Sequence, residues 1–129
     1  MKPTILLFVT TLLFSACQEM ETIDMSQLSP KEKKAVESLL WLQDADPDKQ
    51  AAQALEKGDK RLLAMASRAT LLPGIEPELH SKAKSICGIR YLEGSTDTVF
   101  GEIHLQLIQR ATDYAAAYNK IVVKHCLAQ

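Results

Sequence analysis

The strongest structural signal in this 129-residue chain is its last stretch, where no proline or glycine interrupts residues 102–128. Apolar side chains recur there every three or four residues, the spacing that aligns them along one face of an α-helix. The sequence therefore predicts a long helix with one buried face, and residues 95–97 offer caps for its start. The predicted stripe consists of Phe100, Ile103, Leu107, Ala111, Tyr114, Tyr118 and Ile121, widened by Ile108, Ala115 and Val122. The residues expected away from its centre are Arg110, Asp113, Asn119 and Lys120.

A shorter helix is predicted to begin after Ser29, which is a suitable N-cap. Pro30 suits the first helical position, and Glu32 completes a capping box. We expect this helix to stop at residues 44–47, where Asp, Ala and Pro follow one another. One stripe of this helix consists of Ala35, Val36, Leu39, Leu40 and Gln43.

A second short helix is predicted from the cap Asp46 and Pro47 up to Gly58, which can close it in the left-handed conformation. Because the connection to the preceding helix is short, the pair resembles an αα-hairpin. The side chains expected to face inward are Ala51, Ala52 and Leu55.

The middle of the chain gives weaker signals. Residues 60–72 fit either a helix or a buried strand, and periodicity cannot decide between them. The turn at Pro73-Gly74 precedes a short helical stretch at 77–85 and a short strand at 86–92. The predicted fold is α+β and predominantly helical, with an N-terminal helix pair, one or two short strands and a long C-terminal helix. It forms a single small domain, residues 29–129.

The N-terminus has the order of a secretory signal peptide. Lys2 is followed by an apolar run at 5–14, then by small residues and the polar pair Gln18-Glu19. As a helix, this run would reach about 15 Å, whereas a bilayer core is about 30 Å thick. The run is therefore too short to be a permanent span.

The segment Leu13-Phe14-Ser15-Ala16-Cys17 resembles a lipobox, the cleavage motif of bacterial lipoproteins, although Phe14 stands where Leu is usual. The resemblance implies removal of residues 1–16 and a lipid on Cys17, with residues 17–28 as lipid anchor and tether. Gln18 resembles the sorting position of lipoproteins in the outer membrane of Gram-negative bacteria, facing the periplasm. The alternative is a soluble secreted protein in which Cys17 is incidental.

Export also bears on the other two cysteines, Cys87 and Cys126. An oxidising compartment favours a disulfide between them. Closing a loop of about 40 residues would stabilise the domain by about 4 kcal/mol in the chain-entropy model. The alternatives are two buried free thiols or a metal pair with a histidine.

No catalytic constellation, cofactor motif or metal site is predicted. None of His80, His104 and His125 has a metal-ligand spacing, and no nucleophile elbow, phosphate loop or dinucleotide fingerprint is present. The chain carries 15 Lys and Arg against 16 Asp and Glu. Such balance gives no electrostatic case for nucleic acid.

Two functions remain as hypotheses. The favoured one is a non-catalytic envelope lipoprotein, held to the membrane by its lipid anchor, that binds another envelope protein or helps to assemble a complex. Trp41 is its candidate partner contact, since Trp is enriched at interface anchors; the alternative is packing under the tether or against residues 60–72. The second hypothesis is a small periplasmic enzyme or ligand-binding protein that uses the loop 93–97 and His104.

Overall fold

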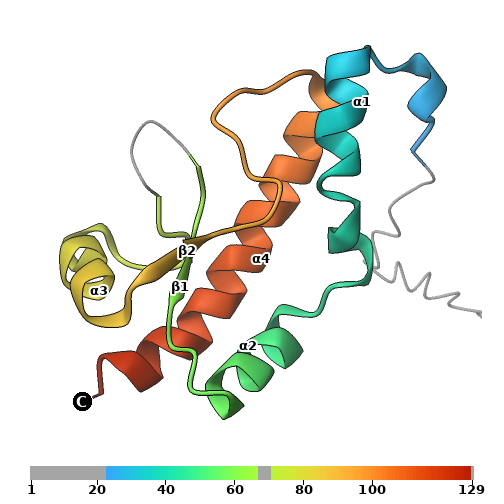
Figure 1. Ribbon diagram of the computed structural model, residues 1–129. Helices are drawn as coiled ribbons and strands as arrows, with labels where there is room; N and C mark the ends of the chain where they lie inside the picture. Colours follow the sequence, from blue (N-terminus) through green and yellow to red (C-terminus); the bar gives the residue numbers. More distant parts are fainter. Residues whose placement is uncertain (1–22, 67–70, 129) are drawn as a thin grey trace, which may run out of the picture.

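The computed structural model describes residues 23–66 and 71–128 (Figure 1). The signal segment, the lipobox-like motif and Cys17 lie outside these residues. Four α-helices and two short strands follow one another, with single turns of 3-10 helix at Met25–Gln27, Leu40–Asp44 and Pro77–Leu79. The predominantly helical α+β fold is confirmed. In chain order the main elements are α1 (Pro30–Glu37), α2 (Pro47–Glu56), β1 (Leu62–Ala64), α3 (His80–Cys87), β2 (Ile89–Tyr91) and α4 (Glu102–Cys126).

The long helix α4 is the centre of the fold, as predicted, and the other helices and β1 all pack against it (Figure 1). Its buried face is rotated relative to the predicted stripe. Ile103, Tyr114 and Ile121 are only partly buried, whereas the polar residue Asn119, expected away from the centre, is fully buried. The buried residues of α4 are His104, Leu107, Ala111, Ala115, Tyr118, Asn119, Val122 and Cys126.

Local capping signals fix the starts of α1 and α2. The Ser29 hydroxyl accepts a hydrogen bond from the Glu32 amide at 3.2 Å. Asp46 accepts from the Asp48 and Lys49 amides at 3.0 and 3.3 Å. Gly58, with a φ of 78°, closes the end of α2 by donating to the Leu55 carbonyl. These caps confirm the predicted helix starts, because they depend only on residues a few positions apart.

The predicted αα-hairpin is wrong. α1 ends at Glu37, and a 3-10 segment at Leu40–Asp44 separates it from α2. The two helices lie one after the other along α4 instead of against each other (Figure 1). Each has a narrow apolar side, consisting of Ala35 and Val36 in α1 and of Ala51 in α2, which faces the core. Gln43 and Ala52, expected to face inward, are exposed.

The two strands form a parallel pair in which Leu62 lies opposite Ile89 and Ala64 opposite Tyr91. The ambiguous segment 60–72 thus contains a fully buried strand, followed by an antiparallel bridge between Met65 and Leu71. The second predicted strand is shorter than expected, because residues 86 and 87 complete the last turn of α3.

The part of the expected tether that the structure describes is attached to the domain. Met25–Gln27 forms a turn of 3-10 helix whose start is capped by Asp24. Ile23, Met25 and Leu28 pack against the hydrophobic core. Among the residues described, no helix has the length and apolar character needed to cross a bilayer.

Candidate functional site

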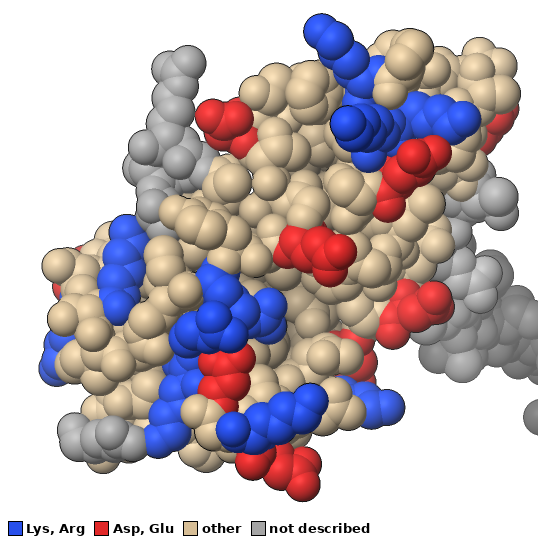
Figure 2. Space-filling view, viewed as in Figure 1, with Lys and Arg blue, Asp and Glu red and all other residues tan. Residues whose placement is uncertain are grey.

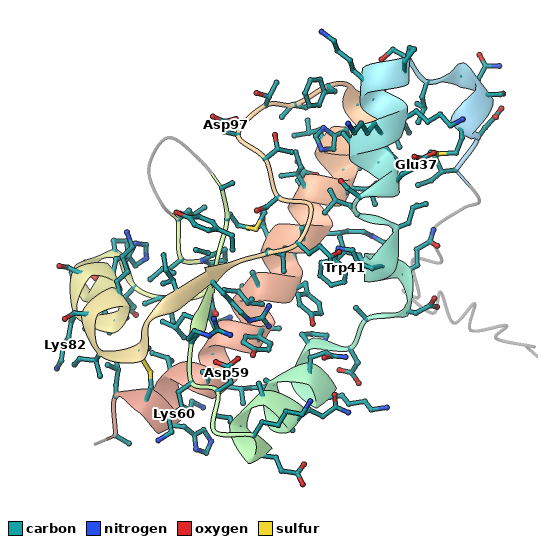
Figure 3. The ribbon with its side chains drawn as sticks, in the orientation of Figure 1. Glu37, Trp41, Asp59, Lys60, Lys82 and Asp97 are labelled. Atoms are coloured by element: carbon teal, nitrogen blue, oxygen red, sulfur yellow. A yellow bond between two sulfur atoms is a disulfide. The ribbon has the colours of Figure 1, made fainter. Side chains whose placement is uncertain are left out.

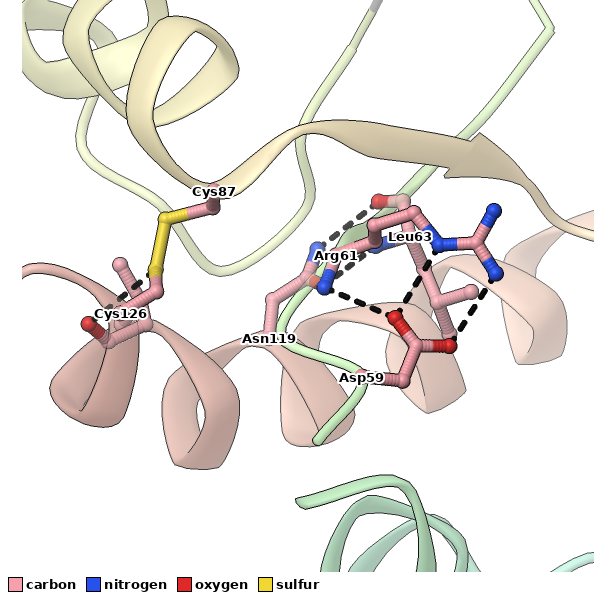
Figure 4. The surroundings of a disulfide bond; sticks show 7 residues. Asp59, Arg61, Leu63, Cys87, Asn119 and Cys126 are labelled. Atoms are coloured by element: carbon pink, nitrogen blue, oxygen red, sulfur yellow. Dashed lines mark hydrogen bonds and ion pairs between the residues drawn. A yellow bond between two sulfur atoms is a disulfide. The ribbon is translucent and has the colours of Figure 1, made fainter. Parts of the chain in front are cut away.

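A disulfide joins Cys87, the last residue of α3, to Cys126, the last residue of α4 (Figure 4). The two Cα atoms are 5.5 Å apart, within the usual range for the bond, and both residues are buried. Because the sulfurs are bonded to each other, neither acts as a thiolate nucleophile or as a metal ligand in this state. The predicted pairing is therefore present in the structure.

Asn119 connects α4 to β1 just beside this disulfide (Figure 4). Its side-chain oxygen accepts from the Leu63 amide at 2.7 Å, and its nitrogen donates to the carbonyls of Leu63 and Pro73, both at 2.9 Å. The amide side chain pairs with β1 as the peptide of a third strand would. This explains how a polar group is tolerated in the core, since each of its hydrogen bonds replaces one that water would make.

The start of α4 is held by a residue far away in the sequence. Its N-cap is Gly101, which has no side chain to offer, and the predicted caps at 95–97 are therefore wrong. Instead, the Glu32 carboxylate on α1 accepts a hydrogen bond from the His104 amide at 3.4 Å. A Cβ at Gly101 would overlap this carboxylate. Glu32 thus complements the positive end of the α4 dipole instead of completing the capping box predicted for α1.

His104 lies at the same place and is fully buried. Its Nδ1 accepts a hydrogen bond from the Phe100 amide at 3.1 Å, which assigns the ring proton to Nε2. No group in the described residues pairs with Nε2. Burial lowers the pKa of His104, and the nearby Glu32 carboxylate opposes this shift only in part. A neutral ring enclosed in this way is poorly placed to exchange protons with a substrate.

No hydrogen bond or ion pair joins His104 to Glu93 or Asp97, the acidic residues expected to accompany it in an active site. Glu93 and Asp97 are exposed, and Figure 3 shows Asp97 at the outer bend of the loop. The Asp97 carboxylate accepts from the Thr98 hydroxyl at 3.2 Å, a local turn contact. The structure does not bring Glu93, Asp97 and His104 together as an acid–base set.

Trp41 fixes this loop to the helices (Figure 3). Its Nε1 donates to the Glu93 carbonyl at 3.1 Å, and its ring meets Tyr114 of α4 edge to face, with centroids 5.2 Å apart. The side chain is only partly buried. It packs on the loop before α4 and against the hydrophobic core. Trp41 therefore has an intramolecular role, and its contact with a partner stays a prediction.

The remaining histidines are apart from one another and from His104. His80 bonds through Nε2 to the Ile75 carbonyl at 2.8 Å, and His125 is exposed near the end of α4. Within residues 23–66 and 71–128, no group of three His, Cys, Asp or Glu side chains is arranged to hold a metal ion.

A pair of arginines that sequence reasoning did not single out lies near the strands. Arg61 donates from Nε and a terminal nitrogen to both oxygens of Asp59, at 3.0 and 3.1 Å, and this pairing lowers the pKa of Asp59. Arg90 on β2 stacks over the Tyr118 ring, with its guanidinium carbon 5.5 Å from the centroid. The buried Nε of Arg90 and the buried hydroxyl of Tyr118 have no hydrogen-bond partner among the described residues.

Figure 2 shows Lys and Arg gathered in two places on this face, over α1 and around the sheet and α3. The segments 57–66, 71–92 and 114–128 carry eight Lys and Arg against three Asp and Glu, a net charge of +5. The other described segments, 23–56 and 93–113, carry five against eleven, a net charge of −6. We call these two sets of segments the basic half and the acidic half, although the acidic half includes Lys31, Lys33 and Lys34 on α1. The near-zero total charge hides this difference between the segments.

No family model, no curated protein and no solved structure matches this chain.

Proposed function

We propose that this protein is a small cell-envelope lipoprotein, anchored through Cys17, that binds another envelope protein or helps to assemble an envelope complex without catalysing a reaction. In a host with two membranes, the Gln18 position favours the outer membrane, with the domain facing the periplasm. The observation that carries the proposal is the Cys87–Cys126 disulfide. Such bonds persist in oxidising compartments and are rare in the cytosol, which agrees with an N-terminal export signal.

A protein-binding role is supported by the surface. Of the described residues, Tyr91 on β2 and Ile86 on α3 are the most exposed large apolar side chains, at 57% and 53% exposure. Single exposed apolar residues are ordinary. Here, however, they belong to consecutive elements at the edge of the sheet. Aromatic residues are also enriched at protein interfaces.

The alternative, a small periplasmic enzyme or ligand-binding protein at loop 93–97 and His104, has less support. Its only imidazole is fully buried and already accepts a hydrogen bond from the Phe100 amide. General acid–base catalysis requires the group to reach the proton that it transfers. A substrate would therefore have to displace the start of α4 before it met this ring.

Intact mass spectrometry of the native protein, with and without reductant, tests the location. We expect a chain that begins at Cys17, carries diacylglycerol on it, and gains the mass of two hydrogens when Cys87 and Cys126 are reduced. The matched control is Cys17→Ser, which should lose the lipid and leave the membrane fraction. A cytoplasmic product that retains Met1 would refute the proposal.

Crosslinking in intact cells, followed by purification from the envelope, tests the protein-binding role. We expect a specific partner whose recovery falls in Trp41→Ala. Trp41→Phe is the matched control, because it keeps an aromatic ring against Tyr114. Recovery of no partner from the crosslinked envelope, together with unaffected Trp41→Ala cells, would contradict the role.

A further inference from the structure

The two edges of the small sheet differ in how they are covered. On β1, the outer N–H and C=O belong to Leu63, and the Asn119 side chain pairs with both of them. On β2, none of the residues in 23–66 and 71–128 provides an equivalent group. The outer edge of β1 is therefore hydrogen-bonded by a side chain, whereas the outer edge of β2 is not hydrogen-bonded within the described residues.

The register shows which groups of β2 face outward. The Leu62 amide donates to the Gly88 carbonyl and the Leu92 amide donates to the Ala64 carbonyl, both at 2.9 Å. In a parallel pair the inward and outward residues alternate along the strand. Ile89 and Tyr91 consequently direct their N–H and C=O groups to the outer edge. Among the described residues, no backbone or side-chain hydrogen bond to these groups is found.

Arg90 lies between these two residues, and its side chain is on the α4 face of the sheet, over Tyr118. Unlike Arg61, which is bound to Asp59, Arg90 has no ion pair within the described part of the chain. A guanidinium offers a planar fork that matches a carboxylate. Arg90 also belongs to the basic half of the molecule, so an acidic group would approach a favourable field.

We propose that the outer edge of β2 binds an extended acidic segment of a partner protein by strand addition, with a partner carboxylate on Arg90. Main-chain groups of the segment pair with Ile89 and Tyr91, as in other cases of strand addition to a sheet edge. The residue opposite Arg90 points to the same face of the sheet, which brings its carboxylate to the guanidinium. The inference rests on the proposed protein-binding function and gives it a surface and a kind of partner.

A bare polyanion or an anionic membrane could pair with the Arg90 charge, but it could not pair with the backbone N–H and C=O groups of β2. The free N–H and C=O groups of an edge strand are matched by another peptide backbone. The exposed Tyr91 ring lies on the opposite face from Arg90, where an apolar side chain of the partner segment can pack against it. An extended segment that alternates acidic and apolar residues meets all three requirements together.

The test uses the mature chain with Cys17→Ser and synthetic peptides of roughly seven residues, a usual strand length. One peptide alternates Val and Glu, and its matched control alternates Val and Lys. Backbone NMR signals are followed during titration. We expect the Val–Glu peptide to shift signals of residues 88–92 and to bind at least about tenfold more tightly than the Val–Lys peptide, a difference of about 1.4 kcal/mol. Equal binding, or shifts confined to other elements, would overturn the proposal.

Two substitutions locate the contact. Arg90→Gln should weaken the Val–Glu peptide about tenfold, whereas Lys49→Gln, which removes a positive charge from α2 in the acidic half, should not. Tyr91→Pro removes an outward amide that has no partner in the described fold, and proline is tolerated on edge strands. It should abolish binding while the disulfide and the circular dichroism stay unchanged. Retained affinity in either β2 variant would refute the proposal.

Heparin and vesicles that contain anionic phospholipid are titrated in parallel. If heparin or the vesicles shift the same β2 signals and displace the peptide, the site recognises negative charge alone, and strand addition is refuted. The proposed function fails separately, when the crosslinked envelope yields no partner at all. A partner whose recovery is the same in Arg90→Gln and Tyr91→Pro cells would refute only the β2 site.

Discussion

The two ends of α4 are held by different kinds of chemistry. At the N-terminal end, the Glu32 carboxylate and the His104 ring accept hydrogen bonds from backbone amides. At the C-terminal end, a covalent bond between Cys87 and Cys126 and the amide of Asn119 join the helix to α3 and β1. One helix can thus be tied to its neighbours by a weak, pH-sensitive contact at one end and by a strong, redox-sensitive one at the other.

The largest effect is expected from removal of the disulfide. The double substitution Cys87→Ser and Cys126→Ser, or reduction of the native protein, should lower the free energy of unfolding by about 4 kcal/mol, because a long loop in the unfolded chain is no longer constrained. Urea unfolding with and without reductant measures this. The double variant is the control for the reductant and should not respond to it. A loss below about 1 kcal/mol would show that the C-terminal end does not depend on this bond.

Asn119→Ala should cost about 3 kcal/mol, since it leaves three buried backbone groups, two of Leu63 and one of Pro73, without partners at about 1 kcal/mol or more each. Urea unfolding with the disulfide intact measures it. The neighbouring exposed Lys120→Ala serves as control and should stay within about 0.5 kcal/mol of the wild type. Equal effects of the two substitutions would contradict the role of Asn119 as a substitute strand.

At the other end of α4, Glu32→Ala should lower the free energy of unfolding by about 1 kcal/mol, as for the loss of a helix cap. Glu37→Ala on the same helix removes an exposed carboxylate that caps no helix among the described residues, and it is the matched control. Thermal unfolding of both variants gives the comparison. If Glu37→Ala were as costly as Glu32→Ala, the contact between Glu32 and the start of α4 would carry no special stability.

The smallest expected effect is a pH dependence from His104. Its pKa is lowered from 6.5 in the folded state, because burial disfavours the charged ring. Below about pH 6.5 the unfolded chain therefore binds protons more readily than the folded chain does. Stability consequently decreases as the pH is lowered, until the folded pKa is reached. Protonation of Nδ1 would also break the hydrogen bond from the Phe100 amide, because a protonated nitrogen cannot accept it.

The measurement is the urea midpoint of the wild type and of His104→Gln at about pH 7.5 and about pH 5.5. On acidification, the urea midpoint should decrease less in the variant than in the wild type. Subtracting one decrease from the other removes the contribution of the carboxylates that both proteins share. The same decrease in both proteins would show that the N-terminal end of α4 does not sense pH through this ring.

Sequence patterns predicted well the features that depend on neighbouring residues. The caps of α1 and α2, the length of α4 and the pairing of the cysteines all follow from short motifs, from periodicity or from the small number of possible partners. The hairpin, the caps at 95–97 and the outward placement of Asn119 were wrong, because each depends on a residue distant in sequence. Asn119 interrupts an apolar stripe beside Tyr118, and its burial depends on the backbone of β1.

The candidate site was even less accessible to sequence reasoning. The sequence singled out Trp41 as a candidate partner contact, but its contacts with Glu93 and Tyr114 could not be read from spacing. Arg90 gives no local signal, since an arginine in a short strand is ordinary. Its lack of an ion pair, and the open edge on which it stands, only became visible when β1, β2 and α4 were placed together.

By itself, the sequence determined the helical class of the domain, where α1 and α2 begin and how far α4 extends, because hydrogen bonds between near neighbours decide these features. Only the tertiary structure decided which face of α4 is buried, which carboxylate caps it and which edge of the sheet stays free. Those outcomes depend on groups from distant segments that meet in the core, where every buried polar group needs a partner.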